Sequence, residues 1–294
     1  MQKRECAIFG SGGNPQNFYN DGFKETADIF KWLKEKNIDS YEYQAGNGFR
    51  ASSSALKKIG ENARENNIVL SVHAPYYISL ASDSEEIAAK SINHVVKTLD
   101  GAIIMGADII VVHCGGLCGK TRAEALEKSK ETLGKILEIL YNSDKIKSKI
   151  KIGLETMGKK NQLGTLEEVI GMCKLDSEIL VPVVDFGHLN ARETGAKFKT
   201  REDYYKIFEI IETDLSSGAA KYLHCHFSKI EYTQAGEKKH LTFEDKIFGP
   251  EFEPLAEVLT DSKNKLFPNI ICESSGTMDT DALYMKKIYN EKGS

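Results

Sequence analysis

Histidines and carboxylates recur in this sequence directly after short apolar runs, the places where buried strands end. Six residues occupy such positions: His73, His113, Glu155, Asp185, His226 and Glu273. Imidazole nitrogens and carboxylate oxygens are the ligands of zinc and related divalent metals. One zinc takes about four ligands, so these six side chains, together with His188 and His240, are too many for a single ion. Two or three metals that share a bridging carboxylate would use them all, and such clusters bind phosphate groups and activate water.

Eight strand patterns alternate with eight helix patterns, and this alternation predicts how the polar side chains are positioned. The strands are predicted at residues 5–9, 40–43, 68–73, 108–113, 149–155, 180–185, 222–226 and 269–273. The helices are predicted at residues 21–36, 53–66, 84–105, 122–140, 165–173, 201–212, 251–259 and 280–289. The strands are nearly continuous apolar runs, as in parallel sheets that are covered on both faces.

Strict alternation over 294 residues predicts an α/β protein, a single (β/α)8 TIM barrel domain over residues 1–294. In such a barrel the carboxyl ends of the strands ring one mouth, where the active site lies. An open doubly wound sheet is the alternative. Its glycine-rich fingerprint is weak here, because Gly-Ser-Gly-Gly at residues 10–13 is followed by Asn-Pro and no immediate helix. Residues 228–250 have no helical pattern and are predicted to form a functional loop.

The composition is that of an ordinary globular protein, with 41% hydrophobic and 28% charged residues. No apolar run reaches the roughly 18 residues that cross a bilayer, and the apolar stretch near residue 1 is too short for a secretory signal. We therefore expect a cytoplasmic protein with no membrane association, and a monomer. The net charge of −4 disfavours a surface devoted to nucleic acid but allows a local basic groove. The six scattered cysteines are expected to be reduced thiols.

Some histidines and cysteines are interpreted as structural. His94 lies within a helix pattern, away from any strand end. His224 precedes His226 by two residues, so alternation turns both side chains to the same face of the strand. The deeper position of His224 favours a supporting role over metal ligation. The same alternation turns Cys225 and Cys272 towards the helix layer, so we do not expect them to be ligands.

The strand-end motifs resemble, in order and spacing, those of the endonuclease IV family, apurinic/apyrimidinic endonucleases of the xylose isomerase-like superfamily. The resemblance runs from about residue 5 to residue 290. It rests on His-Ala-Pro-Tyr at residues 73–76, His113, Glu155-Thr156, Asp-Phe-Gly-His at residues 185–188 and Ile-Cys-Glu at residues 271–273. The resemblance implies a (β/α)8 barrel that holds two zinc ions bridged by Glu155. One set of ligands would be His73, His113 and Glu155, and the other Glu155, Asp185, His226 and Glu273.

A third metal in this family is held by one histidine and an Asp-x-His pair. His188 and His240 match the two histidines, but Lys238 stands where the aspartate is expected. Three alternatives follow: Glu237 replaces the aspartate, the third site is weak or empty, or Lys238 itself offers a fixed positive charge to a substrate phosphate. The family's His-Leu-Asn-Asp segment also differs and reads His-Phe-Ser-Lys at residues 226–229.

The resemblance implies a hydrolase that cuts double-stranded DNA 5′ to abasic sites in base excision repair. It would use two or three zinc ions, with manganese as a substitute. Glu155 or Glu273 would orient or deprotonate the attacking water. Four loop residues are predicted to contact the DNA: Tyr76, Asn47, Arg50 and Lys238.

The alternative function is that of a divalent-metal-dependent sugar isomerase or epimerase of the same superfamily. There one metal would be held by Glu155, Asp185, His226 and Glu273, and two of the carboxylates would transfer a proton beside a carbonyl group. Such an enzyme has no need of the additional histidines. The number of metal ions per chain therefore separates the two hypotheses.

Overall fold

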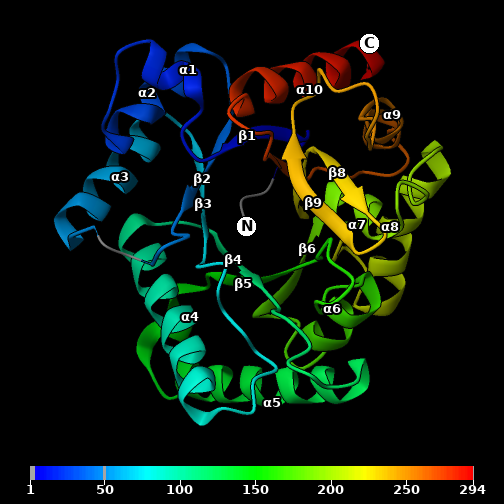
Figure 1. The fold of residues 1–294 in the computed structure, drawn as a ribbon. Helices are drawn as coiled ribbons and strands as arrows, with labels where there is room; N and C mark the ends of the chain where they lie inside the picture. Colours follow the sequence, from blue (N-terminus) through cyan, green and yellow to red (C-terminus); the bar gives the residue numbers. More distant parts are fainter. Residues whose placement is uncertain (1–3, 49–50, 294) are drawn as a thin grey trace.

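Eight parallel strands close into a barrel in the computed structural model, which describes residues 4–48 and 51–293 (Figure 1). The barrel strands are β1 (Ile8–Gly12), β2 (Ser40–Gln44), β3 (Val69–His73), β4 (Ile109–His113), β5 (Lys151–Glu155), β6 (Leu180–Asp185), β7 (His224–Phe227) and β10 (Asn269–Cys272). Their order around the barrel is β1-β10-β7-β6-β5-β4-β3-β2. Every neighbouring pair is parallel. The predicted (β/α)8 TIM barrel is confirmed.

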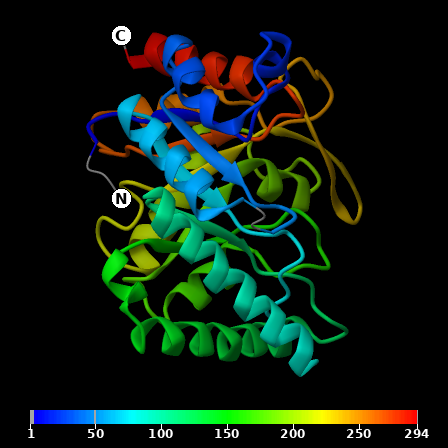
Figure 2. The same ribbon diagram turned by 90° about the vertical axis from the view of Figure 1, so that its left-hand side faces the viewer.

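Helices connect the strands and cover the outside of the barrel (Figures 1 and 2). They are α1 (Gln16–Asn20), α2 (Ile29–Glu35), α3 (Ser53–Glu65), α4 (Glu85–Met105), α5 (Arg122–Tyr141), α6 (Leu166–Cys173), α7 (Phe186–Arg192), α8 (Arg201–Asp214), α9 (Glu253–Thr260) and α10 (Met278–Gly293), with 3-10 turns η1 (Thr26–Asp28) and η2 (Asp144–Ser148). In α5, α6 and α8 a threonine caps the first turn, as their sequences favour. Among the described residues, no helix has the length and apolar character that crossing a membrane requires.

Strand side chains alternate between the helix layer and the barrel interior. Ile110 of β4 packs into the hydrophobic layer beneath the helices. Its neighbour Ile109 belongs to a separate small cluster with Val183 of β6, inside the barrel. Cys225 and Cys272 lie in the outer layer, as the alternation predicts. The histidines and carboxylates at the strand ends therefore occupy the inward-facing positions of their strands.

The structure differs from the predicted elements in four places. Strand β1 spans Ile8–Gly12 rather than residues 5–9. The sequence pattern missed its second half because glycines weaken a strand pattern. Of the predicted 21–36 helix only η1 and α2 form; the separate helix α1 precedes it, and Gly22, with a φ of 90°, turns the chain between them. Helix α7, directly after β6, has no counterpart in the prediction. Residues 228–250 are not an open loop but contain an antiparallel hairpin.

This hairpin consists of β8 (Lys229–Thr233) and β9 (Gly236–Leu241) and stands out from one end of the barrel (Figure 2). Since β8 follows β7, that end is the C-terminal mouth. The hairpin is tied to the loop after β5: the amide of Lys160 donates to the carbonyl of Ala235 at 3.0 Å, and the amide of Glu237 donates to the carbonyl of Gly158 at 3.1 Å. The hairpin is thereby fixed over the mouth.

Candidate metal centre

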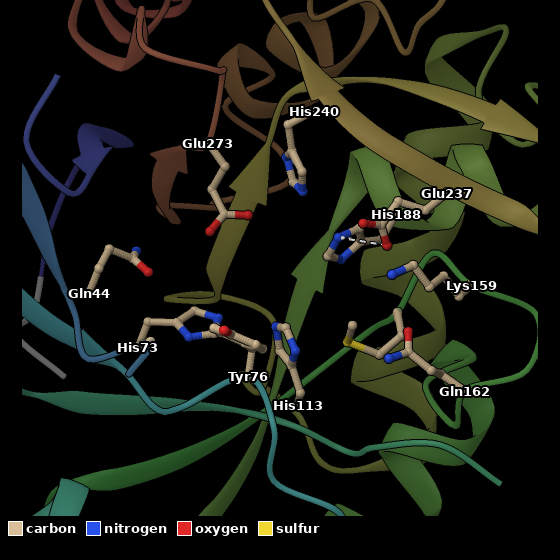
Figure 3. Close-up of a pocket in the computed structure, with 12 residues that line it drawn as sticks. Gln44, His73, Tyr76, His113, Lys159, Gln162, His188, Glu237, His240 and Glu273 are labelled. Carbon is tan, nitrogen blue, oxygen red and sulfur yellow. Dashed lines mark ion pairs between the residues drawn. The ribbon is translucent and has the colours of Figure 1, made fainter. Parts of the chain in front are cut away.

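A cavity of about 350 Å³ opens at the C-terminal mouth of the barrel (Figure 3). Six of the residues predicted from the sequence line it: His73, Tyr76, His113, His188, His240 and Glu273. Glu155, Asp185 and His226 have no solvent exposure. All eight predicted metal ligands fall into three clusters, in each of which the donor atoms lie within 4.8 Å of one another.

The first cluster joins the ends of β3, β4 and β5. Nε2 of His73 and Nε2 of His113 lie 3.3 and 3.0 Å from the same carboxylate oxygen, Oε2 of Glu155. Nδ1 of His73 lies 2.7 Å from the carbonyl oxygen of Ala74. Because a carbonyl oxygen only accepts, this hydrogen bond places a proton on Nδ1 and leaves Nε2 as the ligand atom.

The second cluster contains Glu155, Asp185, His226 and Glu273, at the ends of β5, β6, β7 and β10. Nδ1 of His226 lies 3.1 Å from Oε1 of Glu155 and 3.4 Å from Oε2 of Glu273. Glu155 thus offers one oxygen to each of the first two clusters. Oδ1 of Asp185 accepts the amide of His188 at 2.7 Å and caps α7, while its buried Oδ2 has no hydrogen-bond partner among the described residues.

The third cluster is formed by His188, Glu237 and His240. Nε2 of His188 lies 3.5 Å from Oε2 of Glu237, and the rings of His188 and His240 are 5.4 Å apart. A β-bulge explains why residues three apart on β9 share a face: Glu231 pairs with Lys239 and Tyr232 with Glu237, so one residue is skipped.

Lys238 is that skipped residue, and its ammonium pairs with Glu231 of β8. Of the alternatives left open by the sequence, the geometry therefore favours Glu237 in place of the expected aspartate. The predicted substrate contact by Lys238 has no support in its position, because this side chain does not line the cavity.

The charges of the centre balance one another in the buried interior. Burial opposes a charge on His73, but its hydrogen bond with Glu155 raises the pKa of His73 to about 9. Burial raises the pKa of Asp185 to about 6, despite the neighbouring His188. Burial also opposes ionisation of Glu273, but His226 lowers the pKa of Glu273 to about 2. Protons on histidines thus balance the carboxylates, and a bound dication would replace these protons.

The donor set fits zinc. Two ligands of a tetrahedral zinc are separated by about 3.3 Å, given a bond length of about 2.0 Å to nitrogen or oxygen. Four donor pairs in the first two clusters lie 3.0 to 3.4 Å apart, and all donors of each cluster lie within 4.8 Å of one another. Oδ2 of Asp185 makes no hydrogen bond among the described residues and lies 3.2 Å from Nδ1 of His188, so it is a further buried donor for a cation.

The predicted substrate residues differ in their placement. Tyr76 lines the cavity and is 60% exposed, so its ring is available to a ligand. Asn47 is exposed on the loop after β2 but does not line the cavity. Arg50 lies outside the described residues. Lys159, not predicted from the sequence, extends from the loop after β5 towards Glu237 (Figure 3).

Glu42 is the other residue that sequence reasoning missed. It lies in β2 with no solvent exposure, and its oxygens approach His224 at 2.8 Å and His226 at 3.0 Å. The sequence feature that could have identified Glu42 is the strand segment Ser-Tyr-Glu-Tyr-Gln, in which a carboxylate alternates with two tyrosines. His224, predicted to be a supporting residue, contacts this carboxylate.

Comparison with known proteins places the chain in a family. Residues 30–279 match the family model described as "Xylose isomerase-like TIM barrel". The chain is 30% identical over 291 residues to an uncharacterized protein of Methanocaldococcus jannaschii, covering 99% of this chain and 100% of that protein. It is 27% identical over 235 residues to "Probable endonuclease 4" of Mycoplasma genitalium, covering 78% of this chain and 74% of that protein.

Solved structures share the fold. Endonuclease IV from Thermus thermophilus superposes with a TM-score of 0.69 at 15% identity, over 97% of this chain and 98% of that chain. A D-tagatose 3-epimerase-like protein superposes with a TM-score of 0.67 at 22% identity, over 97% and 96% of the two chains. The fold is a TIM barrel with a ring of strand-end histidines and carboxylates that could hold a metal ion. The chain belongs to the xylose isomerase-like TIM barrel family.

Proposed function

We propose that this protein is a zinc-dependent hydrolase of the endonuclease IV type, which cuts the DNA backbone 5′ to abasic sites. The observation that carries the proposal is the presence of three donor clusters at one mouth of the barrel, two of them sharing Glu155. A metal-dependent isomerase needs only one such cluster. Relatives named "Probable endonuclease 4" also support this assignment.

The three clusters name the residues that would hold the metal. His73, His113 and Glu155 form one set; Glu155, Asp185, His226 and Glu273 form the second; His188, Glu237 and His240 form the third. Zinc in these sites supplies Lewis acidity towards a phosphoryl oxygen and makes water a better nucleophile at neutral pH. Manganese accepts a similar nitrogen and oxygen donor set.

The chain's own residues position the substrate and the water. Glu273 lines the cavity and has a pKa of about 2, because His226 outweighs the effect of burial. A carboxylate that is ionised at neutral pH, and so weakly basic, is suited to accepting a hydrogen bond from the attacking water and orienting it. Tyr76 offers an exposed ring for stacking beside the missing base. Lys159 provides a cation for a phosphate.

The test is nicking of a duplex with one abasic site, compared with the same duplex intact. We expect cleavage of the abasic strand only, loss of cleavage after prolonged chelation, and recovery on addition of zinc. Glu155→Gln serves as the inactive control. A zinc-loaded protein that leaves abasic DNA whole would overturn the proposal.

The second candidate is a sugar epimerase with one metal on the second cluster. The cavity volume of about 350 Å³ favours it, since this volume falls in the range of small-molecule sites. The shared fold with a D-tagatose 3-epimerase-like protein is consistent with it. One metal ion per chain, with interconversion of a ketose and its epimer, would establish this function instead.

A further inference from the structure

A buried polar network continues from the metal centre into the barrel. Glu42 of β2 stands at its middle with no solvent exposure. Its Oε2 atom accepts the hydroxyl of Ser71 at 2.8 Å and the Nε2 hydrogen of His224 at 2.8 Å. Its Oε1 atom lies 3.0 Å from Nε2 of His226, an ion-pair distance, although the two atoms are not aligned for a hydrogen bond in this structure. Glu42 thus connects His224 to a residue of the second metal cluster.

The two nitrogens of His226 face opposite ways. Nδ1 faces the carboxylates of Glu155 and Glu273, at 3.1 and 3.4 Å. Nε2 faces Glu42. His73 has the reverse arrangement, since its Nδ1 donates to a backbone carbonyl and its Nε2 faces the cluster. His226 therefore needs an acceptor on its Nε2 side to present the Nδ1 lone pair to a metal.

We propose that Glu42 is a positioning residue for the metal centre: it holds the proton of His226 on Nε2 and directs Nδ1 towards the second cluster, while His224 and Ser71 fix its own carboxylate. The inference rests on the metal-binding part of the proposed function and is independent of the substrate. Carboxylate groups behind a ligating histidine have this effect in metal sites, where they orient the ring and raise its basicity.

The network extends beyond the residues that touch Glu42. Nδ2 of Asn269 lies 3.5 Å from Nδ1 of His224, and the hydroxyl of Ser40 donates to Oδ1 of Asn269 at 2.6 Å. Each donor in this series faces an acceptor, which is consistent with a proton on Nε2 of His224. Gly10 of β1 leaves room for the Ser40 hydroxyl of this network, because a Cβ atom on Gly10 would lie 2.1 Å from Oγ of Ser40.

The barrel interior does not require this polarity. Ile109, Val111 and Val183 fill the part formed by β4 and β6 with hydrophobic side chains. A buried carboxylate is costly unless it is paired and hydrogen-bonded. The polar groups Glu42, Ser71, His224 and Asn269 come from β2, β3, β7 and β10, whereas β4 and β6 contribute the apolar side chains. This distribution supports a role in the metal centre over a role in packing.

The test compares Glu42→Gln with the wild-type protein in zinc alone, without nucleic acid. Glutamine has the same shape but one acceptor oxygen, so it cannot accept from His226 on one side and from His224 and Ser71 on the other. We expect the full number of zinc ions at saturation, but a roughly 10- to 100-fold weaker affinity for one of them in competition with a chromogenic chelator. Nitrogen-15 NMR of the zinc-loaded wild type should show the His226 proton on Nε2.

Asp279→Asn is the matched control, because Asp279 is a buried carboxylate held by Asn17 at 3.0 Å and belongs to none of the donor clusters. It should leave zinc affinity unchanged. If Glu42→Gln does not fold, Ser71→Ala removes one donor to Glu42 and should weaken the same affinity severalfold.

Two results would overturn the inference. Unchanged zinc affinity in both Glu42→Gln and Ser71→Ala would show that the network has no influence on the metal. Loss of one zinc equivalent at saturation would make Glu42 itself a ligand, as its approach to His73 and Glu273 permits. A zinc-loaded protein that fails to cut abasic DNA would contradict the proposed substrate but not this inference.

Discussion

Glu155 offers one carboxylate oxygen to each half of the metal centre. Oε2 faces His73 and His113 at 3.3 and 3.0 Å, and Oε1 faces His226 at 3.1 Å. Glutamine at this position would turn an amide towards one half. We expect Glu155→Gln to bind at least one zinc fewer per chain and to lose roughly a hundredfold or more in nicking rate. His240→Ala affects only the third cluster and should lose less. Equal losses would contradict the bridging role.

In this geometry Glu237 belongs to the third cluster, and Lys238 does not. Oε2 of Glu237 lies 3.5 Å from His188, whereas Lys238 pairs with Glu231. We expect Glu237→Gln to weaken the third zinc by about tenfold or more, and Lys238→Asp to change neither zinc content nor nicking rate. Elemental analysis and nicking kinetics on both variants measure this. A gain of zinc in Lys238→Asp would show that the hairpin adopts a different register in solution.

At the scale of single residues, the sequence predicted the strand-end histidines and carboxylates that gather at the barrel mouth, but not the residues deeper in the barrel. A histidine or carboxylate that ends a run of β-branched residues marks the mouth of the barrel. Glu42 sits instead in the middle of β2 between Tyr41 and Tyr43. Alternation alone could not distinguish a lumen-facing carboxylate from a solvent-facing one. Its partner His224 comes from a strand that is distant in sequence.

The β8–β9 hairpin is the element that completes the third cluster. Gly236 has a φ of 94°, and a Cβ atom there would lie 2.2 Å from the carbonyl oxygen of Gly158. We expect Gly236→Ala to separate the hairpin from the loop after β5 and to move Glu237 away from His188. The protein should then bind the first two zinc ions with unchanged affinity and the third roughly tenfold or more weakly, as competition with a chromogenic chelator would measure.

Gly218→Ala is a suitable control for this substitution. Gly218 also has a positive φ, of 87°, but a Cβ atom on it would meet no atom within 4 Å. Gly218→Ala therefore introduces the same backbone strain as Gly236→Ala but makes no contact near the third cluster. Weaker binding of the third zinc in both variants would mean that general destabilisation is responsible.

Among the elements, those with long apolar patterns were predicted and those shaped by tertiary contacts were not. The runs that end at His113 and Asp185 identify β4 and β6 directly. Strand β1 has little apolar pattern because its glycines make room for Ser40 in the crowded interior. The hairpin sequence is charged, and its bulge depends on pairing with β8 and on the loop after β5. Neither of these contacts can be recognised from the sequence of the hairpin itself.

At the scale of the whole molecule, the protonation of the centre connects metal binding to stability. In the metal-free protein the carboxylates raise the pKa of His73 to about 9 despite its burial, and they also raise those of His188 and His226. In the unfolded chain these histidines have a pKa near the usual value of about 6.5. Between these values the folded state binds more protons than the unfolded state, so the free energy of unfolding falls as pH rises.

We therefore expect the metal-free protein to be less stable at pH 9 than at pH 7 in urea unfolding, by up to about 1.4 kcal/mol per pH unit for each such histidine. Zinc binds neutral imidazoles and replaces the protons, so the zinc-loaded protein should lose little stability over the same range. His73→Asn should reduce the pH dependence of the metal-free protein. His94→Asn should leave it unchanged, because His94 lies on α4 and its pKa is lowered by burial. A metal-free protein equally stable at both pH values would show that protons on these histidines do not balance the buried carboxylates.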